Sequence, residues 1–351
     1  MHFFLIANDY GESLCLDSIS SELKQREHTT IEVFGRGKNL ALTEKIVQQA
    51  LDADVFITAI SEFNEAEVAL AKNVWNQKPC MPTVVYAPGR YAFRNKGATS
   101  LRGITDLLLV GNTDEVEEAK TLYPRAAQVA AVGNVLHENF YPELSMAEAR
   151  KKIGVGDNQK LIFVPGDKRL GINWPLFHSV IEAAHRACVQ RHSPMVAIGI
   201  HPGDQYPIDM YHDAEKYSRN VPVKIFMRDI LTSAILVTAC DLMVTAVSSL
   251  ATMAAFQRKP IIGFYFENLL ADAEDAQGGK PLEWELESNK AAEVVRGGSV
   301  DLLAETISRL LSPNGFRKMR RHQKIAYPEA PIPGSTAKKA VDIITRPTFN
   351  G

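Results

Sequence analysis

The sequence predicts an α/β protein with two Rossmann-like domains, each built on a doubly wound parallel sheet. Short apolar runs typical of buried strands alternate with helical stretches over short connections, and this alternation begins again near residue 160. The chain has room for two domains, because it has 351 residues, of which 46% are hydrophobic. We expect the domains to face a central cleft, since ligands of open α/β sheets bind at the carboxyl ends of the strands.

The first half of the chain contains six expected strands, each a short apolar run bounded by polar residues. They are His2–Ala7, Thr30–Phe34, Asp54–Ile60, Thr83–Tyr86, Asp106–Val110 and Gln128–Val132. Helices are expected between them at residues 12–26, 42–52, 64–76 and 113–122. The order predicts one doubly wound parallel sheet.

The second half repeats this pattern. Its expected strands are Lys160–Val164, Met195–Ile200, Val223–Phe226, Leu242–Val244, Pro260–Phe264 and Glu293–Val295. Helices are expected at 147–153, 174–191, 230–240, 300–311, 316–325 and 335–344, and the acidic stretch 267–279 is expected to be a loop. We therefore expect an N-terminal domain at 1–154, a C-terminal domain at 155–334, and a final helical segment at 335–351 that packs back on the first domain.

Charge and cysteine content limit the classes of partner. A net charge of −2 provides no general field that would gather nucleic acid, so no nucleic-acid partner is expected and any basic binding surface would have to be local. The four cysteines show no CxxC spacing, which argues against a zinc site and favours buried thiols in a reducing compartment. No signal peptide pattern and no apolar segment of about 20 residues is present, so we expect a cytoplasmic protein without a transmembrane segment. The sequence is compatible with a homodimer.

Several common catalytic signatures are missing from the sequence. It contains no GxGxxG fingerprint, no Walker A sequence, no GxSxG elbow and no HExxH pair. The sequence therefore disfavours four enzyme classes: nicotinamide-dependent dehydrogenases, P-loop ATPases, α/β-hydrolases and zinc proteases.

The most informative segment is residues 241–266, DLMVTAVSSLATMAAFQRKPIIGFYF. It predicts a buried strand, a two-serine turn, a short helix and a second buried strand. Ser248 and Ser249 are expected to lie where the helix begins, with Thr252 one turn further on, and N–H groups at a helix start attract anions. The turn is therefore a candidate phosphate site, although a plain helix cap would have the same sequence.

Other candidate ligand-binding residues follow the strands of the second half. Gly166 permits close backbone approach, and the cations Lys168 and Arg169 suit a diphosphate; a solvated turn is the alternative. Candidates also lie in the loops after the later strands. His201 could bind a phosphate or a sugar hydroxyl, Met227 and Arg228 could contact a nucleobase, and Glu267 could face a sugar.

In the first half, two carboxylates follow the first strand. Asp9 or Glu12 is the candidate general base toward an acceptor hydroxyl, if burial raises its pKa toward neutrality. The alternative is local, because an aspartate at this position caps the first helix and a glutamate in the first turn complements the helix dipole.

Together, the two doubly wound domains, the Val132-Gly133-Asn134 turn and the order strand, Ser-Ser, helix, Lys259-Pro260, strand resemble the GT-B glycosyltransferase superfamily. Within it, the chain resembles the group that contains lipid A disaccharide synthase, the UDP-N-acetylglucosamine 2-epimerases and the CDP-glycerol glycerophosphotransferases. The resemblance implies that the 1–154 domain is the acceptor side and that the 155–334 domain binds the nucleotide sugar. The resemblance implies that the Ser248-Ser249 turn, with Leu250, contacts the donor diphosphate, and His201-Pro202 is similar to a His-Pro pair of the glycerophosphotransferases. It also implies that no metal or other cofactor is needed, because helix ends and cations neutralise the leaving diphosphate.

Two departures from the superfamily pattern bear on function. Met253 stands where many members have a ribose-binding glutamate, with Thr252 as the nearby polar residue, and GDKRLG replaces the run that epimerases have after the first strand of this domain. The resemblance thus implies a metal-independent glycosyltransferase that uses a nucleotide-sugar donor, expected to be UDP-linked, and an unknown acceptor. A UDP-sugar 2-epimerase and a non-catalytic nucleotide-sugar-binding protein are the alternatives.

Overall fold

The computed structural model describes residues 1–36, 40–60, 65–138, 140, 142–156, 158–167, 170–187, 194–201, 204, 209–216, 221–226, 230–246, 248–276 and 284–346. The chain forms two compact units. The first consists of Met1–Asn139, Asp275–Lys280 and Pro331–Gly351, and the second of Phe140–Glu274 and Pro281–Ala330. The units divide upstream of the boundary expected at residues 154 and 155.

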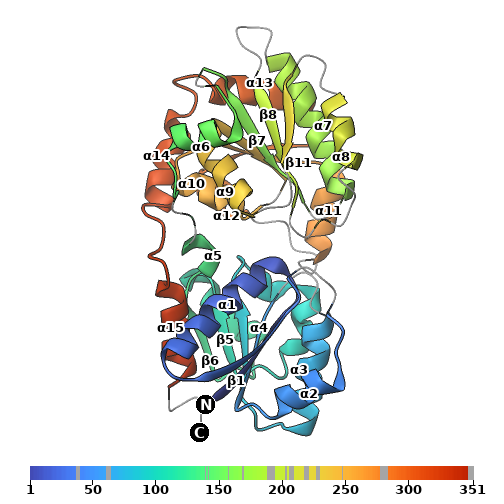
Figure 1. Cartoon of the computed structure of the whole chain (residues 1–351), viewed down its shortest axis with the longest axis vertical. Coiled ribbons are helices and arrows are strands. Elements are labelled where there is room, and N and C mark those ends of the chain that lie inside the picture. The colour runs from blue at the N-terminus through green and yellow to red at the C-terminus, as the bar shows by residue number, and fades with distance from the viewer. Residues whose placement is uncertain are drawn as a thin grey trace. The chain divides into compact units, whose positions relative to one another are not determined.

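The first unit has a six-stranded parallel sheet with the strand order β2-β1-β3-β4-β5-β6. Figure 1 shows helices on both of its faces. The strands are β1 (His2–Ala7), β2 (Thr29–Phe34), β3 (Val55–Ala59), β4 (Thr83–Ala87), β5 (Leu107–Val110) and β6 (Gln128–Ala131). The helices are α1 (Tyr10–Gln25), α2 (Glu44–Leu51), α3 (Glu65–Gln77), α4 (Val116–Leu122), α5 (Val135–Glu138) and α15 (Ser335–Ile344), with the 3₁₀ segments η1 (Ala92–Arg94), η2 (Lys96–Leu101) and η3 (Thr113–Glu115).

Alternation along the strands explains the two layers of helices. In β1, Phe3 and Leu5 join one apolar cluster with α1, α5 and α15, whereas Phe4 and Ile6 join a second cluster with α2 and α3. Successive side chains of a strand point to opposite faces, so a sheet covered on both sides needs an unbroken apolar run. The sequence HFFLIA meets this requirement.

Helix α15 completes the first unit, although it follows the whole second unit in the sequence. It packs against α1, and Ala337, Val341 and Ile344 are buried in the cluster that contains Phe3. The buried carboxylate of Glu138 holds the start of α15. It accepts hydrogen bonds from the Gly334 N–H (2.8 Å), the Ser335 hydroxyl (3.0 Å) and the Thr336 N–H.

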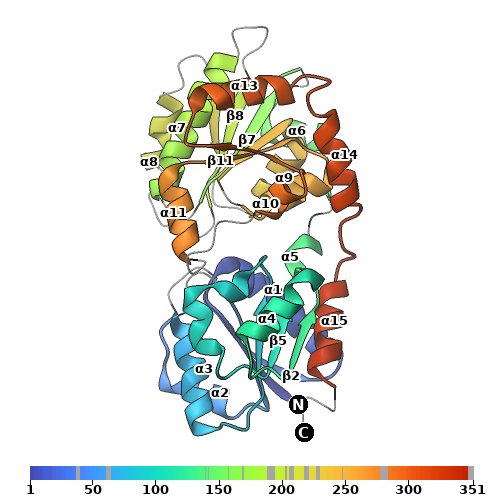
Figure 2. The same ribbon diagram turned by 180° about the vertical axis from the view of Figure 1, so that it is seen from behind.

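The second unit has a six-stranded parallel sheet with the order β12-β11-β10-β7-β8-β9. Figures 1 and 2 show α7 and α8 on one face and α6, α9 and α10 on the other. The strands are β7 (Leu161–Pro165), β8 (Met195–Gly199), β9 (Val223–Phe226), β10 (Leu242–Thr245), β11 (Ile261–Tyr265) and β12 (Glu293–Arg296). The helices are α6 (Met146–Ile153), α7 (Leu170–Ala187), α8 (Asp209–Lys216), α9 (Ile230–Ala239), α10 (Leu250–Phe256), α11 (Glu267–Ala276), α12 (Glu285–Ser288), α13 (Val300–Leu310) and α14 (Arg317–Ala326).

The strand orders locate the switch point of each sheet, where the chain reverses its direction of progress across the sheet. In the second unit the switch point lies between β7 and β10, and in the first unit between β1 and β3. Loops at the carboxyl ends of these strands diverge to opposite faces, which leaves a crevice where ligands of open α/β sheets bind.

Two sequence expectations about local structure need correction. The acidic stretch expected to be a loop forms α11 over Glu267–Ala276, because its Glu, Leu and Ala residues favour a helix and Leu269 is buried in the core. Helix α8 was not expected at all, since its sequence is mostly polar. Among the described residues, no helix has both the length and the apolar character needed to cross a membrane.

Candidate functional site

The turn at the carboxyl end of β10 has the expected strand, turn and helix. Ser249 stands at the N-cap of α10, its side chain is exposed, and it makes no side-chain hydrogen bond to the helix. Ser248 is half-buried, and its hydroxyl oxygen accepts a hydrogen bond from the Leu250 N–H at 3.3 Å. The half-buried Thr252 lies three residues after Ser249, so both residues lie on the same side of α10.

The backbone of this turn is more occupied than the sequence suggested. The expected free N–H groups of Ala251 and Thr252 donate to the carbonyl oxygens of Ser248 and Ser249, at 3.0 and 3.1 Å. The turn thus bonds to itself in a tight 3₁₀ pattern, which is common where a helix begins. The groups that it presents outward are the serine and threonine hydroxyls.

The loop after β7 approaches the same switch point. The Gly166 N–H donates to the Gly199 carbonyl oxygen at 2.7 Å, and a Cβ at Gly166 would lie 3.0 Å from that oxygen. The neighbouring backbone therefore favours a glycine here, independently of any ligand. Lys168 and Arg169, the two cations predicted beside it, lie outside the described residues, as do Met227 and Arg228 after β9.

A buried polar chain connects the loops after β7 and β8. Asn173 of α7 accepts a hydrogen bond from the Asp167 N–H (2.6 Å) and donates to the Asp167 carbonyl oxygen (2.8 Å) and to the Tyr211 hydroxyl (3.2 Å). The Tyr211 hydroxyl in turn donates to the Asp204 carboxylate. Asn173, Tyr211 and Asp204 are all buried. Since buried polar groups that satisfy one another fix loop geometry, this chain holds the two loops at one edge of the sheet.

His201 and Glu267 occupy two further loops of the carboxyl edge. His201 is half-buried directly after the end of β8, and its carbonyl oxygen accepts from the Asp204 N–H at 3.0 Å. Glu267 is exposed at the first position of α11, after β11. The described residues therefore place Gly166, His201, Ser248, Ser249 and Glu267 along one edge of the second sheet.

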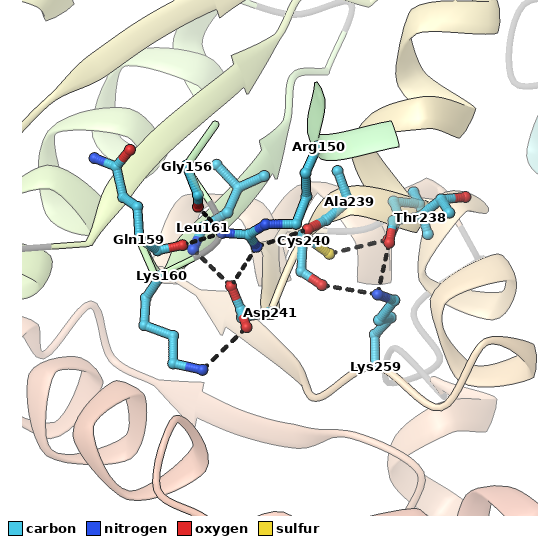
Figure 3. A network of polar contacts seen from close by, with 11 residues as sticks. Arg150, Gly156, Gln159, Lys160, Leu161, Thr238, Ala239, Cys240, Asp241 and Lys259 are labelled. Carbon is cyan, nitrogen blue, oxygen red and sulfur yellow. Dashed lines mark hydrogen bonds and ion pairs between the residues drawn. The ribbon is translucent and has the colours of Figure 1, made fainter. Parts of the chain in front are cut away.

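The opposite, amino edge of this sheet contains a purely structural network, shown in Figure 3. Arg150 of α6 is buried and donates to the Asp241 carboxylate at 3.0 Å and to the Gly156 carbonyl oxygen at 2.7 Å. Lys259 donates to the carbonyl oxygens of Thr238 and Cys240, at 2.7 and 2.9 Å, where α9 ends. Burial lowers the pKa of Lys259. Lys259 of the Lys-Pro pair thus caps α9 and lies at the amino edge of the sheet, opposite the Ser248-Ser249 turn.

In the first unit, Asp9 and Glu12 lie at the switch point, at the start of α1. Asp9 occupies the N-cap position without a side-chain hydrogen bond to the helix, and its carbonyl oxygen accepts from the Ser13 hydroxyl at 2.6 Å. Glu12 lies in the first turn of α1, and both carboxylates are half-buried. The predicted base candidates are thus accessible from one loop.

A third carboxyl group at this switch point was not predicted. Glu67 of α3 is completely buried, and its Oε1 atom accepts a hydrogen bond from the Asn8 N–H at 2.6 Å. Its Oε2 atom and the Asn8 Oδ1 atom are buried without hydrogen-bond partners. Burial, with a smaller contribution from the Asp9 charge, raises the pKa of Glu67 from 4.5 to about 7. A carboxyl group with a pKa near neutrality therefore lies in the residue that holds this loop.

The loop after β4 is also fixed by carboxylates. Tyr91 has a left-handed backbone with φ of 54°, and its N–H donates to the buried Glu115 at 2.5 Å. The Arg94 guanidinium lies 3.5 Å from the centre of the Tyr91 ring and pairs with both oxygens of Glu118. Burial raises the pKa of Glu115. The loop is therefore rigid, with cations and an aromatic ring at the carboxyl edge of the first sheet.

Among the described residues, no group of three or more His, Cys, Asp or Glu side chains is arranged to hold a metal ion. Neither a protein-family model nor a curated protein sequence matches the chain.

Solved structures, in contrast, match the chain over nearly its whole length. A glycosyltransferase from Rickettsia africae is 11% identical, with 97% of each chain covered and a TM-score of 0.63. UDP-GlcNAc 2-epimerase from Neisseria meningitidis, bound to UDP-GlcNAc, is 12% identical, with 98% of this chain and 99% of that chain covered and a TM-score of 0.64. Anabaena HepE in complex with UDP and glucose is 14% identical, with 97% and 98% covered and a TM-score of 0.62.

At these identities the matches establish architecture. Two parallel six-stranded sheets with flanking helices, matched along almost the entire chain, confirm the fold that the sequence resemblance implied. This chain has the GT-B fold of two Rossmann-like domains, as glycosyltransferases and UDP-GlcNAc 2-epimerases do.

Proposed function

We propose that this protein is a glycosyltransferase that moves a sugar from a nucleoside-diphosphate sugar to an acceptor hydroxyl without a metal ion. The observation that carries the proposal is the hydroxyl-bearing turn Ser248-Ser249 at the switch point of the second sheet, in a fold whose solved examples include complexes with UDP and UDP-sugars. The donor is expected to be UDP-linked for the same reason.

The donor diphosphate would lie against the Ser248-Ser249 turn and the Gly166 loop. The exposed Ser249 hydroxyl and the nearby Thr252 hydroxyl supply hydrogen bonds, and Lys168 and Arg169 are proposed to supply positive charge. His201, Met227, Arg228 and Glu267 are proposed contacts for the sugar, ribose and base. Together these groups would neutralise the charge that develops on the leaving diphosphate.

The acceptor hydroxyl would be activated by Asp9 or Glu12 in the first unit. Glu67 holds this loop in place, because its carboxylate accepts a hydrogen bond from the N–H of Asn8, the residue before Asp9. We assign Glu67 a positioning role, since it is completely buried and does not reach a ligand. Because the pKa of Glu67 is about 7, its protonation state changes near neutral pH. This change would then affect the position of the Asn8-Asp9 loop.

Nucleotide binding is the first test of this function. A thermal-shift screen against UDP-, GDP-, CDP- and TDP-sugars should raise the melting temperature for one base, because a ligand selective for the folded state stabilises it. The Ser249→Trp variant should fold and lose that affinity in calorimetry. Asn158→Trp is the matched control, since Asn158 is exposed in the loop before β7, at the amino edge of the same sheet. An unchanged affinity of Ser249→Trp would refute the assignment of the turn.

Epimerisation of a UDP-sugar is the second candidate, and it is favoured by the full-length match to an epimerase bound to UDP-GlcNAc. The two reactions differ in their need for an acceptor. Incubation with the donor alone, followed by NMR of the sugar, should leave a transferase donor unchanged and should convert an epimerase substrate. Tight binding without turnover under either condition would identify a nucleotide-sugar-binding protein.

A further inference from the structure

Helix α14, far from both switch points in sequence, has an unusual concentration of positive charge. Its sequence, RKMRRHQKIA, contains five arginine and lysine residues and no acidic residue, in a chain of net charge −2. The five cations are Arg317, Lys318, Arg320, Arg321 and Lys324. A local surface of this kind lets a chain with so little net charge attract a polyanion.

One side of α14 is buried and well anchored. Met319 and Gln323, four residues apart, are buried in the second unit, and the Gln323 amide donates to the carbonyl oxygens of Lys259 (2.8 Å) and Ala291 (2.9 Å). These contacts fix the rotation of the helix about its axis. The opposite arc must therefore face away from the core, at the margin of the second unit seen in Figure 2.

The outward arc consists of the five cations and one aliphatic residue. All five cations are exposed, and none of them makes an ion pair or a side-chain hydrogen bond to any residue that the structure describes. Ile325 lies between Lys318 and Arg321 on a helical projection and is 74% exposed. Arg258 adds a sixth cation nearby; burial, and then the charge of Arg320, lower the pKa of Arg258. The charges of Arg258 and Arg320 therefore repel each other.

We propose that the outward arc of α14 docks the protein on the surface of an anionic lipid bilayer. Lysine and arginine side chains attract anionic headgroups, and an exposed aliphatic side chain among them inserts at the boundary between headgroups and acyl chains. A short amphipathic helix on a folded domain provides both contributions at once. The contact is peripheral and reversible, because it depends on a few charges and one apolar side chain.

The composition of the arc distinguishes a bilayer from a nucleic acid. Arginine and lysine bind the phosphates of either partner, but nucleic-acid interfaces add Asn, Gln, Ser and Thr side chains, and single strands stack on aromatic rings. The outward arc of α14 has none of these; its one uncharged residue is Ile325. An isoleucine contributes little to a phosphate backbone and much to a lipid interface.

The experiment is co-sedimentation of the full chain with vesicles. One set contains equal parts of phosphatidylglycerol and phosphatidylcholine, and the other contains phosphatidylcholine alone. We expect binding to the first set only, weakened by added salt. At about 1 kcal/mol for each cation at the surface, the variant Lys318→Gln/Arg321→Gln should bind about 25-fold more weakly, and Lys318→Glu/Arg321→Glu should not bind measurably. Ile325→Ser should weaken binding while leaving its salt dependence unchanged.

The control keeps the charge change and moves its position. Lys338→Glu/Lys339→Glu alters two exposed lysines of α15 and should bind like the unmodified protein. The proposal is overturned if neutral vesicles bind equally, if both α14 double variants bind normally, or if the protein retains short duplex DNA or single-stranded RNA but no vesicles. Circular dichroism of each variant confirms folding, and the Gln pair remains informative if charge reversal disturbs the helix.

Discussion

The replacement of Glu67 by glutamine should make the first unit more stable at neutral and alkaline pH. The Glu67 carboxyl group has a pKa of about 7 in the folded protein, raised from 4.5 mainly by burial. The folded state thus binds this proton more tightly than the unfolded state, so stability is highest below pH about 4.5 and falls as the pH rises to about 7. At about 1.4 kcal/mol for each pKa unit, the loss amounts to about 3 kcal/mol.

A glutamine at this position avoids that loss and keeps the native hydrogen bond. Its carbonyl oxygen can still accept the Asn8 N–H. We therefore expect Glu67→Gln to gain up to about 3 kcal/mol above pH 7 and to show no pH dependence from this site.

Native-state hydrogen exchange of peptides from β1 and β3 measures the opening free energy of the first unit alone. Glu65→Gln is the control, because Glu65 is exposed in the same helical turn and both variants lose one charge near the start of α3. The reasoning is refuted if Glu67→Gln is no more stable than Glu65→Gln at about pH 8, or if the unmodified protein does not lose stability between about pH 5 and pH 7.

Three further substitutions test the other buried polar contacts. Glu138→Ala should cost the first unit about 3 kcal/mol and expose α15 to exchange, because three donors lose their acceptor; full protection of α15 would contradict this role. Tyr211→Phe should lower the urea stability of the second unit by about 2 kcal/mol, since Asn173 and Asp204 lose a shared partner, and a neutral effect would show that water replaces the hydroxyl. Lys259→Met should lower the free energy of unfolding by about 2 kcal/mol and leave nucleotide affinity unchanged, because Lys259 caps α9 at the amino edge. If calorimetry shows weaker nucleotide binding at unaltered stability, Lys259 belongs to the ligand site instead.

The sequence predicted the fold well because its signals are local. Apolar runs such as HFFLIA and VFITA are buried strands in the structure, and the residue preferences that limit them act over a few positions. The expected loop at residues 267–279 was wrong over its described part because acidic composition hid a good helix-forming sequence.

The site was only partly predictable, for a physical reason. Gly166 directly follows β7 and Ser249 lies in the short turn after β10, so strand prediction alone places them at the carboxyl edge. The role of Glu67 depends on the pairing of β1 with β3. This pairing brings Asn8, after β1, into contact with Glu67 of α3, which lies 59 positions later in the sequence. The sequence signal for Glu67 is its position at a helix start after β3, a strand at the switch point. Likewise, the contact of Arg150 with Asp241 joins positions 91 residues apart, and nothing local announces it.

The position of α15 has a consequence for how the chain is made. Every residue of the second unit leaves the ribosome before α15 does, so until then the nascent first unit lacks the helix that shields Phe3 and Leu16. The first unit is therefore completed last, although it is synthesised first. Until then, the apolar surface that α15 covers is exposed and prone to aggregation. The fold of the first unit closes when Glu138 first contacts residues 334–336.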